Sequence, residues 1–507
     1  MRTRLRTAVL AGIVAAGTVA VPATAQAIAG GDPVAAGADR YVAKISLATA
    51  ACTGVLVAPQ WVATAASCFP AADIAQGKPG SATTVVVGQP DLTSANHLIG
   101  VTALVGRPDR NLVLAKLTYA VNDVTPLPLG TAAPTAADTV RIDGFGRTAS
   151  EWVPNRLSTT PQTIGAVTAT TMALSGAHDP CKGDAGGPVL RSVGGRTELA
   201  GLITASWGHG CLSETETRSG SVAVRTDDIA GWITQQTAPT ALRFVNRNSQ
   251  RCLAVQGANN VNDAPAFQFD CPSAYDDQAW QLQTTAGGTM IKNAYTGRCL
   301  IVHGGGGPQV VQFDCLPQFG DQFWDIVPLL NGVQVRNKAT NLCLSIGDVP
   351  NGTPATTAAC DATHAEQTWD EKAVPDQLRV VNRASKQCLA VHADNNVNDA
   401  PAFQFDCAPR YADQVWELDP AGDSGYLVRN HATKRCLIVH GGGGDQAVQF
   451  DCLPQFGDQF WDTITVGDAV QLRNKVTGRC LGIASGLAVQ APCNVTNADQ
   501  VWEISPF

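Results

Sequence analysis

The segment Asp179–Leu190, DPCKGDAGGPVL, has the composition of a loop that presents a reactive side chain. Glycines, which let a backbone approach its neighbours closely, lie on both sides of one central residue. The acid beside the centre, Asp184, is of a type that proteins bury only with a partner. The central residue is Ala185, whose methyl group can neither attack a carbonyl carbon nor transfer a proton. The loop therefore predicts a shaped site that lacks its reactive atom.

Three histidines could supply acid–base chemistry in the same region, namely His97, His178 and His209. None stands at a recognisable spacing from a serine or cysteine nucleophile, so we interpret them as surface-loop residues. The sequence has neither a CxxC pair nor an HExxH motif, which are typical of zinc sites. We therefore expect no metal and no cofactor.

The elements that position these residues are predicted to be strands. The segments YVAKISLATA, GVLVA, TTVVVG, NLVLAKL and TVRIDGFG combine β-branched residues with flanking turn residues. One helix is expected at the end of this region, where Ile229, Trp232 and Ile233 share a face. Asp227 or Asp228 can cap it. The region is thus predicted to be an all-β domain with one terminal helix.

Five segments, in order, resemble the trypsin/chymotrypsin-like serine protease family. They are IAGG (28–31), GVLVAPQWVATAASC (54–68), PDRNLVLAKL (108–117), DPCKGDAGGPVL (179–190) and SWGHGC (206–211). The resemblance implies a double β-barrel over residues 28–236, with the bridges Cys52–Cys68 and Cys181–Cys211. It also implies where the catalytic machinery of the family falls in this chain.

The catalytic positions of the family fall on residues of the wrong chemistry. The general base falls on Ser67, the orienting acid on Asn111 and the nucleophile on Ala185. Ser67 cannot accept a proton near neutral pH as an imidazole does, and Asn111 carries no charge. Loss of such a triad costs on the order of 10⁶ in turnover. We therefore expect a catalytically inactive domain; the alternative is an active secreted endopeptidase whose triad lies elsewhere.

The rest of the apparatus implied by the resemblance is kept. The backbone N–H groups of Gly183 and Ala185 match an oxyanion hole. A freed Ile28 amine is expected to pair with Asp184 and order the pocket. Asp179 matches the acid of a trypsin-like specificity pocket, which favours Lys or Arg side chains. Ser206 and Gly208 belong to the wall of that pocket, while Ser221 stands where the family prefers glycine.

Residues 240–507 contain six repeated units. Each opens with a Cys-Leu pair, continues to a second cysteine and closes with a Gln-x-Trp motif. The pairs expected within units are Cys252–Cys271, Cys299–Cys315, Cys343–Cys360, Cys388–Cys407, Cys436–Cys452 and Cys480–Cys493. The segment 261–271 recurs unchanged at 397–407, and CLIVHGGGG recurs at 299–307 and 436–444, which indicates a duplicated module of three units. The two modules span residues 240–373 and 376–507, and their short linkers predict that they pack compactly.

These units resemble the ricin-B-type lectin domain, which implies two β-trefoils. The glutamine and tryptophan of each motif are expected to be structural. The acid that the family uses for sugar, two residues after the first cysteine, is missing from every unit. An aromatic side chain and a different aspartate remain in four units: Phe269 with Asp277, Phe313 with Asp321, Phe405 with Asp413 and Phe450 with Asp458. A sugar ring can stack on such a phenylalanine and donate to the aspartate.

The first 27 residues resemble a secretion signal, with three arginines, a short apolar core and an AQA site. Sixteen cysteines in an exported chain predict disulfides and an extracellular location. A net charge of −8, more negative once the signal is removed, argues against nucleic acid as a partner. No segment is long enough to span a membrane. The expected protein is therefore a secreted, inactive protease homologue that binds glycan or polysaccharide, with a basic peptide or a trypsin inhibitor as a second partner.

Overall fold

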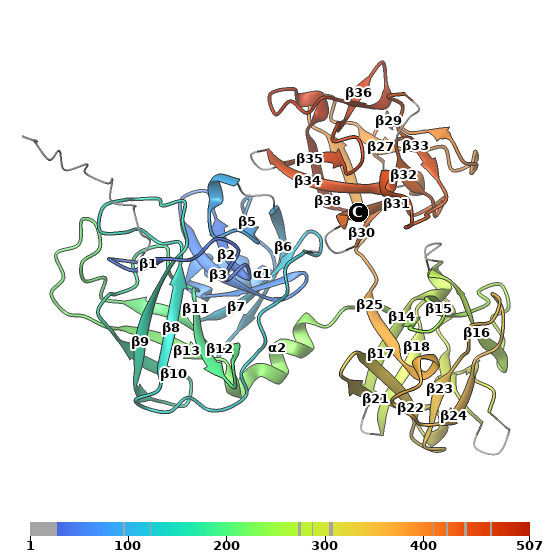
Figure 1. The fold of residues 1–507 in the computed structure, drawn as a ribbon, viewed down its shortest axis with the longest axis horizontal. Helices are drawn as coiled ribbons and strands as arrows, with labels where there is room; N and C mark the ends of the chain where they lie inside the picture. Colours follow the sequence, from blue (N-terminus) through green and yellow to red (C-terminus); the bar gives the residue numbers. More distant parts are fainter. Residues whose placement is uncertain are drawn as a thin grey trace, which may run out of the picture.

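The computed structural model describes residues 28–94, 97–121, 123–271, 275–285, 287–303, 308–408, 410–421, 424–440, 444–466 and 469–507. Three β-rich bodies follow one another along the chain (Figure 1). The predicted all-β class is confirmed, and the two helices are short: α1 (Ala71–Gln76) and α2 (Ala230–Thr237). No helix among these residues is long and apolar enough to cross a membrane.

The first body contains two closed barrels. Barrel one has the order β2-β3-β4-β7-β6-β5, and barrel two consists of β8 to β13 with β1 added at its edge. The strands of barrel one are β2 (Val42–Ser46), β3 (Ala51–Ala58), β4 (Trp61–Thr64), β5 (Thr84–Val87), β6 (His97–Arg107) and β7 (Leu112–Leu117). The others are β1 (Asp32–Pro33), β8 (Thr139–Gly144), β9 (Ser158–Val167), β10 (Thr171–Ser175), β11 (Pro188–Val193), β12 (Arg196–Ser206) and β13 (Ser221–Arg225).

The predicted terminal helix forms, but not with the predicted cap. Ile233 is fully buried on its inner face, as the apolar spacing requires. Asp227 and Asp228 lie in a short 3₁₀ turn before α2 and cap no N–H group of the helix. Their carboxylates are instead engaged by Arg225 and Arg110, and these charge-assisted hydrogen bonds outcompete capping.

The two later bodies are the duplicated modules, here called trefoil 1 and trefoil 2. Trefoil 1 contains β14 (Leu242–Asn246), β15 (Arg251–Val255), β16 (Ala264–Asp270), β17 (Trp280–Thr285), β18 (Gly288–Asn293), β19 (Cys299–Ile301), β20 (Val311–Phe313), β21 (Phe323–Leu329), β22 (Gly332–Asn337), β23 (Leu342–Ser345), β24 (Thr356–Ala359) and β25 (Trp369–Ala373). Trefoil 2 contains β26 (Leu378–Asn382), β27 (Cys388–Ala390), β28 (Ala400–Pro401), β29 (Phe403–Phe405), β30 (Trp416–Pro420), β31 (Tyr426–Asn430), β32 (Cys436–Ile438), β33 (Val448–Phe450), β34 (Phe460–Val466), β35 (Ala469–Asn474), β36 (Cys480–Ala484), β37 (Leu487–Ala491) and β38 (Trp502–Pro506).

The Gln-x-Trp motifs build the cores of both trefoils. All six tryptophans are 0% exposed, and each indole N–H donates to the carbonyl of the leucine after the first cysteine of its unit. Each glutamine is buried, and its amide donates to a backbone carbonyl near the second cysteine. The motif is therefore structural, because the indole N–H and the amide N–H of every unit find acceptors inside that unit.

All eight disulfides form in the predicted pairs, two in the first body and one in each repeated unit. Within the repeats the bridged cysteines are 13 to 19 residues apart in sequence. A bridge that closes a loop of such length stabilises the folded state by about 3 kcal/mol, because it lowers the conformational entropy of the unfolded chain. The disulfides thus add stability to repeated units that are each too small to bury a large core.

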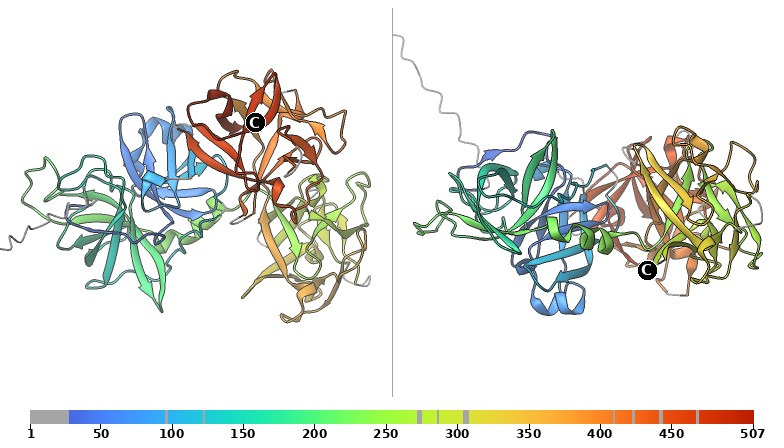
Figure 2. Two further views of the ribbon diagram at one scale, coloured as in Figure 1. Left: turned by 45° about the horizontal axis from the view of Figure 1, so that its top comes forward. Right: turned by 90° about the horizontal axis from the view of Figure 1, so that it is seen from below.

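Trefoil 2 packs back against barrel one of the first body, as the views in Figure 2 show. Tyr426 is 1% exposed, its ring meets Tyr119 edge to face at 5.7 Å, and its hydroxyl donates to the carbonyl of Ala120 at 2.9 Å. Gln60 and Lys116 both contact Asp376 at 2.7 Å. This contact joins the last body of the chain to the first.

We expect Tyr426→Ala to release trefoil 2 from barrel one. Removing a fully buried aromatic side chain costs about 3 kcal/mol, and the carbonyl of Ala120 loses its donor. Small-angle X-ray scattering will show a larger radius of gyration for the variant. Thr289→Ala changes the corresponding position of trefoil 1 and serves as the control; an unchanged radius in Tyr426→Ala would contradict the role of this contact.

Candidate functional site

The residues singled out for catalysis lie together at the seam between the two barrels. Ser67 follows β4 and Asn111 precedes β7. These two strands are paired, with Thr64 opposite Val113, so the two residues lie at the same end of the pair. Ala185 lies in the loop between β10 and β11. Its carbonyl accepts the N–H of Thr53 at 3.0 Å and lies 3.7 Å from Sγ of Cys68, the neighbour of Ser67. Sequence positions far apart therefore converge as the resemblance implied.

Ser67 and Asn111 are hydrogen-bonded to each other. The backbone N–H of Ser67 donates to Oδ1 of Asn111 at 2.8 Å, and Nδ2 of Asn111 donates to Oγ of Ser67 at 3.2 Å. Such a pair can orient the serine hydroxyl but offers no group that titrates near neutral pH. Ala185 packs its methyl group against the core of barrel one. This arrangement holds a side chain in position without supplying a base or a nucleophile.

The loop around Ala185 is held by Thr53, a residue that sequence reasoning did not single out. The Thr53 hydroxyl donates to the carbonyl of Gly183 at 2.8 Å and accepts the N–H of Phe145 at 3.0 Å. Gly183 has φ of +103°, and a Cβ there would lie 2.7 Å from Cα of Gly146. Glycine is therefore required at this position both by conformation and by space.

Two backbone donors in this loop face no acceptor within the described residues. They are the N–H groups of Gly183 and Ala185, the pair expected to form an oxyanion hole. The neighbouring N–H of Gly186 donates to the carbonyl of Ile203 at 2.7 Å, so the loop is otherwise bonded. Two free, adjacent N–H groups are what a developing oxyanion or another acceptor needs.

In the full-length chain Asp184 does not contact the Ile28 nitrogen, and its pairing with a freed Ile28 amine stays a prediction. Its oxygens accept the N–H groups of Gly146 and Cys181, each at 2.7 Å, and no cation contacts it among the described residues. Burial raises the pKa of the carboxyl group to about 7, and the two N–H donors offset only part of this. The reason is covalent: the Ile28 nitrogen is here a peptide nitrogen, while the Ile28 side chain is already fully buried in barrel two.

A cavity of about 360 Å³ opens beside Ala185. Ser206 and Gly208 line it, as expected, together with Lys182 and Glu214, which form an ion pair at 2.8 Å. The loop after Cys211 thus contributes Glu214 to the wall. This ion pair was not predicted, because it depends on where the loop folds.

The proposed specificity acid, Asp179, is already bonded inside the protein. It is 3% exposed, and its oxygens accept the N–H groups of Gly220 at 2.9 Å and His209 at 3.2 Å. The hydroxyl of Ser221, which replaces the glycine preferred by the family, is buried without a hydrogen-bond partner. Asp179 therefore contributes mainly to holding the walls of the pocket together.

In trefoil 1, one predicted sugar-binding pair does line a common cavity. Phe269 and Asp277 face a cleft of about 490 Å³, within the usual range for ligand sites. Tyr275, which sequence reasoning missed, meets Phe269 edge to face at 5.8 Å and lines the same cleft. Burial raises the pKa of Asp277, whose Oδ2 accepts the N–H of Gly257 at 3.1 Å. Aromatic faces and a half-buried carboxylate thus converge here.

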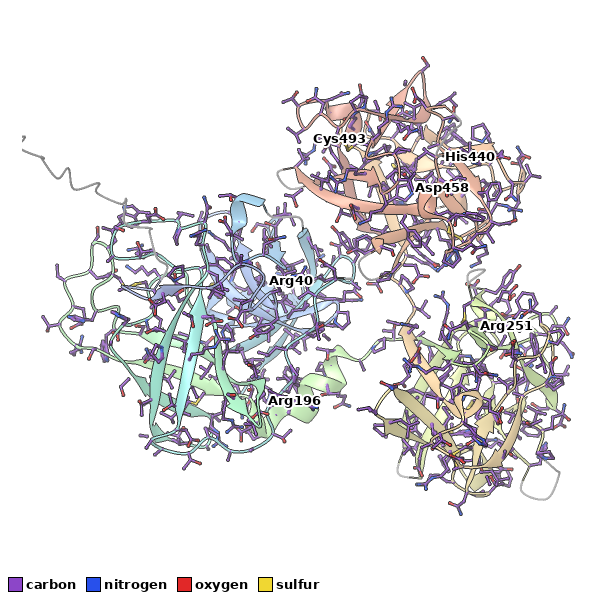
Figure 3. The ribbon with its side chains drawn as sticks, viewed as in Figure 1. Arg40, Arg196, Arg251, His440, Asp458 and Cys493 are labelled. Atoms are coloured by element: carbon purple, nitrogen blue, oxygen red, sulfur yellow. A yellow bond between two sulfur atoms is a disulfide. The ribbon has the colours of Figure 1, made fainter. Side chains whose placement is uncertain are left out.

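Of the other predicted pairs, Phe405 with Asp413 repeats this arrangement, and the remaining two differ from it. Phe405 meets Tyr411 edge to face at 5.8 Å, and burial raises the pKa of Asp413. Phe313 and Phe450 each meet a histidine edge to face at 5.8 Å, and the histidine contacts an aspartate from the preceding unit at 2.6 Å: His303 with Asp263, and His440 with Asp399. Asp321 and Asp458 accept an asparagine amide through their backbone carbonyls (Figure 3 labels His440 and Asp458).

The described residues contain no group of three or more His, Cys, Asp or Glu side chains placed to hold a metal ion. The barrels, their seam and the repeated units define a trypsin-type domain joined to lectin-type trefoils. The comparisons with known proteins agree: residues 28–233 match the Trypsin family, and residues 240–369 and 376–502 match the ricin-type beta-trefoil lectin domain. The chain therefore belongs to the ricin-type beta-trefoil lectin family and carries an N-terminal trypsin domain.

Individual relatives match the trypsin domain. A trypsin of Pleuronectes platessa is 26% identical over 249 residues, which cover 42% of this chain and 92% of that trypsin. A trypsin of Xenopus laevis is 29% identical over 208 residues, covering 36% and 81%. Among solved structures, neuropsin, a serine protease expressed in the limbic system of mouse brain, is 20% identical with a TM-score of 0.35, covering 42% of this chain and 100% of neuropsin.

Proposed function

We propose that this chain is a secreted, catalytically inactive trypsin homologue that binds glycans through its ricin-type modules. The observation that carries the proposal is the seam, where Ser67 and Asn111 bond to each other beside Ala185. The positions of a triad are assembled, and none offers a base or a nucleophile. Free N–H donors and binding alone accelerate peptide hydrolysis by roughly 10³–10⁴-fold over the reaction in water, which is too little for proteolysis.

An active peptidase with a displaced triad is the alternative. It needs a histidine within hydrogen-bond reach of a hydroxyl near Gly183. Within the described residues, neither His178 nor His209 makes such a bond, and the side chain of His97 lies outside the description. All sixteen cysteines are in disulfides, so no thiol is free to act as a nucleophile. These observations support the inactive assignment.

Glycan binding is supported by the match of residues 240–369 and 376–502 to the lectin domain and by the cleft at Phe269 and Asp277. Secretion is supported by eight disulfides, which persist in oxidising compartments. The test of inactivity is turnover of a peptide and ester library by the unaltered chain. We expect a rate equal to that of Ala185→Gly; turnover that scales with the unaltered chain and disappears in a histidine variant would favour the peptidase.

The buried Asp184 predicts a pH-dependent effect of processing at Ile28. Because its folded pKa of about 7 exceeds the ordinary 3.8, the buried carboxyl favours folding when protonated. This contribution is present below about pH 4 and is lost as the pH rises through 7. In a chain that begins at Ile28, the free amine supplies a counter-charge for the ionised form.

Urea unfolding at about pH 5 and about pH 8 checks this prediction on chains that begin at Ile28 or at Ala27. We expect the chain beginning at Ile28 to be more stable at the higher pH by about 1 kcal/mol or more, with a smaller difference at the lower pH. Asp184→Asn in both chains is the control and should abolish the difference. An identical pH dependence of the two chains would rule out the pairing.

A further inference from the structure

The duplication allows each residue of the trefoil 1 cleft to be compared with its copy in trefoil 2. Phe269, Tyr275 and Asp277 correspond to Phe405, Tyr411 and Asp413, and all three types are kept. The surroundings of the two sets have diverged at linked positions. These differences show which copy retains the form of a ligand site.

The cleft of trefoil 1 has a wall that comes from the third unit. Asn351 and Gly352, from the third unit, line it. The loop before them is fixed by Arg251, labelled in Figure 3, whose guanidinium donates to the carbonyl of Val349 at 2.6 Å, and by Gln268, whose amide donates to the same carbonyl at 2.5 Å. A wall fixed by two side chains is preorganised for binding.

In trefoil 2 the corresponding wall is built differently. The bridged cysteines of the last unit are 13 residues apart, against 17 in the third unit, so the loop is shorter. Gln387 replaces the arginine and bonds to Asp406, as Arg251 bonds to the corresponding Asp270, but among the described residues it makes no bond to the loop of the last unit. In addition, the ring of His392 lies 4.3 Å from that of Phe403 and covers the aromatic face that the corresponding Phe267 presents to the cleft.

A further aromatic side chain, Tyr295, lies near Asp277, one of the residues that line the cleft of trefoil 1. This side chain is 61% exposed and lies against Gly257, where a Cβ would come within 2.7 Å of the ring and 3.4 Å of Asp277. Glycine at 257 therefore makes room for the tyrosine beside the carboxylate. Trefoil 2 has Ala393 and Ala432 at these two positions, so both halves of the arrangement are absent together.

Trefoil 2 has instead specialised as a contact surface. Leu418 is 1% exposed and belongs with Tyr426 to the cluster formed with barrel one, while the corresponding Leu282 of trefoil 1 is 37% exposed. The two copies thus differ both where ligands would bind and where the first body docks.

We propose that the two modules divide the work: trefoil 1 binds an uncharged oligosaccharide along the cleft from Phe269 past Asp277 to Tyr295, and trefoil 2 anchors it to the first body. The inference rests on the proposed glycan binding. The described lining residues include one carboxylate and no basic side chain, so uronic, sialylated and sulfated sugars are repelled. Neutral pyranoses stack on the rings and donate hydroxyl groups to Asp277.

The duplication supplies matched controls for the test. Binding of the full-length chain to immobilised neutral tetrasaccharides of glucose, galactose, mannose and N-acetylglucosamine is compared with binding to sulfated and uronic tetrasaccharides. We expect Phe269→Ala with Asp277→Asn to weaken neutral binding at least about tenfold, and Phe405→Ala with Asp413→Asn to leave it unchanged. Tyr295→Ala should weaken tetrasaccharide but not monosaccharide binding, and Tyr295→Phe should retain both.

The possible outcomes distinguish a failure of this inference from a failure of the proposed glycan binding. Equal losses in the two matched pairs, or preference for acidic sugars, would overturn the division of work and leave glycan binding intact. No retention of any glycan by the unaltered chain would overturn both. Asparagine can still accept the N–H of Gly257, and intact unfolding transitions of the variants will show that losses arise at the cleft.

Discussion

Replacing Ser67 by histidine, Asn111 by aspartate and Ala185 by serine together will restore hydrolysis of Arg and Lys esters by roughly 10⁴-fold or more over the unaltered chain. The frame for this chemistry is kept: Ser67 and Asn111 are within 3.2 Å of each other, and the N–H groups of Gly183 and Ala185 face no acceptor among the described residues. The new imidazole gains an orienting carboxylate and a hydroxyl to deprotonate.

The single variants are the controls for this reconstruction. Ala185→Ser alone gains a hydroxyl without a base, and Ser67→His alone gains a base without a nucleophile, so neither should exceed the unaltered chain. The measurement is the initial rate of ester hydrolysis by chains whose disulfides and unfolding transitions are intact. If the folded triple variant hydrolyses no Arg or Lys ester, the assignment of these three positions is wrong.

The second large effect is expected from Trp324→Ala in the core of trefoil 1. The side chain is 0% exposed, and its indole N–H donates to the carbonyl of Leu300 at 2.8 Å. The change leaves a cavity and an unsatisfied carbonyl, which together destabilise the module by about 3–5 kcal/mol.

Hydrogen exchange can localise this destabilisation. Protection should fall across trefoil 1 while the two barrels stay protected, because each body has its own core. Trp152→Ala, at a tryptophan that is 58% exposed, should change unfolding by no more than about 0.5 kcal/mol. Loss of protection limited to β21 alone would show that the motif is not the centre of the module.

The repeat allowed the cysteine pairs of residues 240–507 to be predicted, and the resemblance to the lectin domain implied that the Gln-x-Trp motifs are structural. Both depend on residues within one unit, whose spacing fixes which groups can meet. The cleft wall at Asn351 could not be predicted in this way, because it comes from a different unit and depends on how the trefoil closes. Tyr275 belongs to the same unit as Phe269, but its spacing from the motif residues does not indicate a site. Its role becomes visible only in the structure, where its ring contacts that of Phe269.

Electrostatic partners were the least predictable feature. Asp227 and Asp228 have the types and positions of capping residues, yet arginines from other elements engage both. Asp179 accepts the backbone N–H groups of Gly220 and His209, two partners that its place in the sequence does not indicate. In each case a long-range donor decided the outcome, and sequence spacing carries no information about such donors.

The most direct test of the central claim, that this chain binds glycans without cutting peptides, is a glycan array probed with the full-length protein. We predict saturable binding to uncharged oligosaccharides, reduced at least about tenfold by Phe269→Ala with Asp277→Asn and unchanged by Ala185→Gly. Absence of binding to every glycan on the array would contradict the claim.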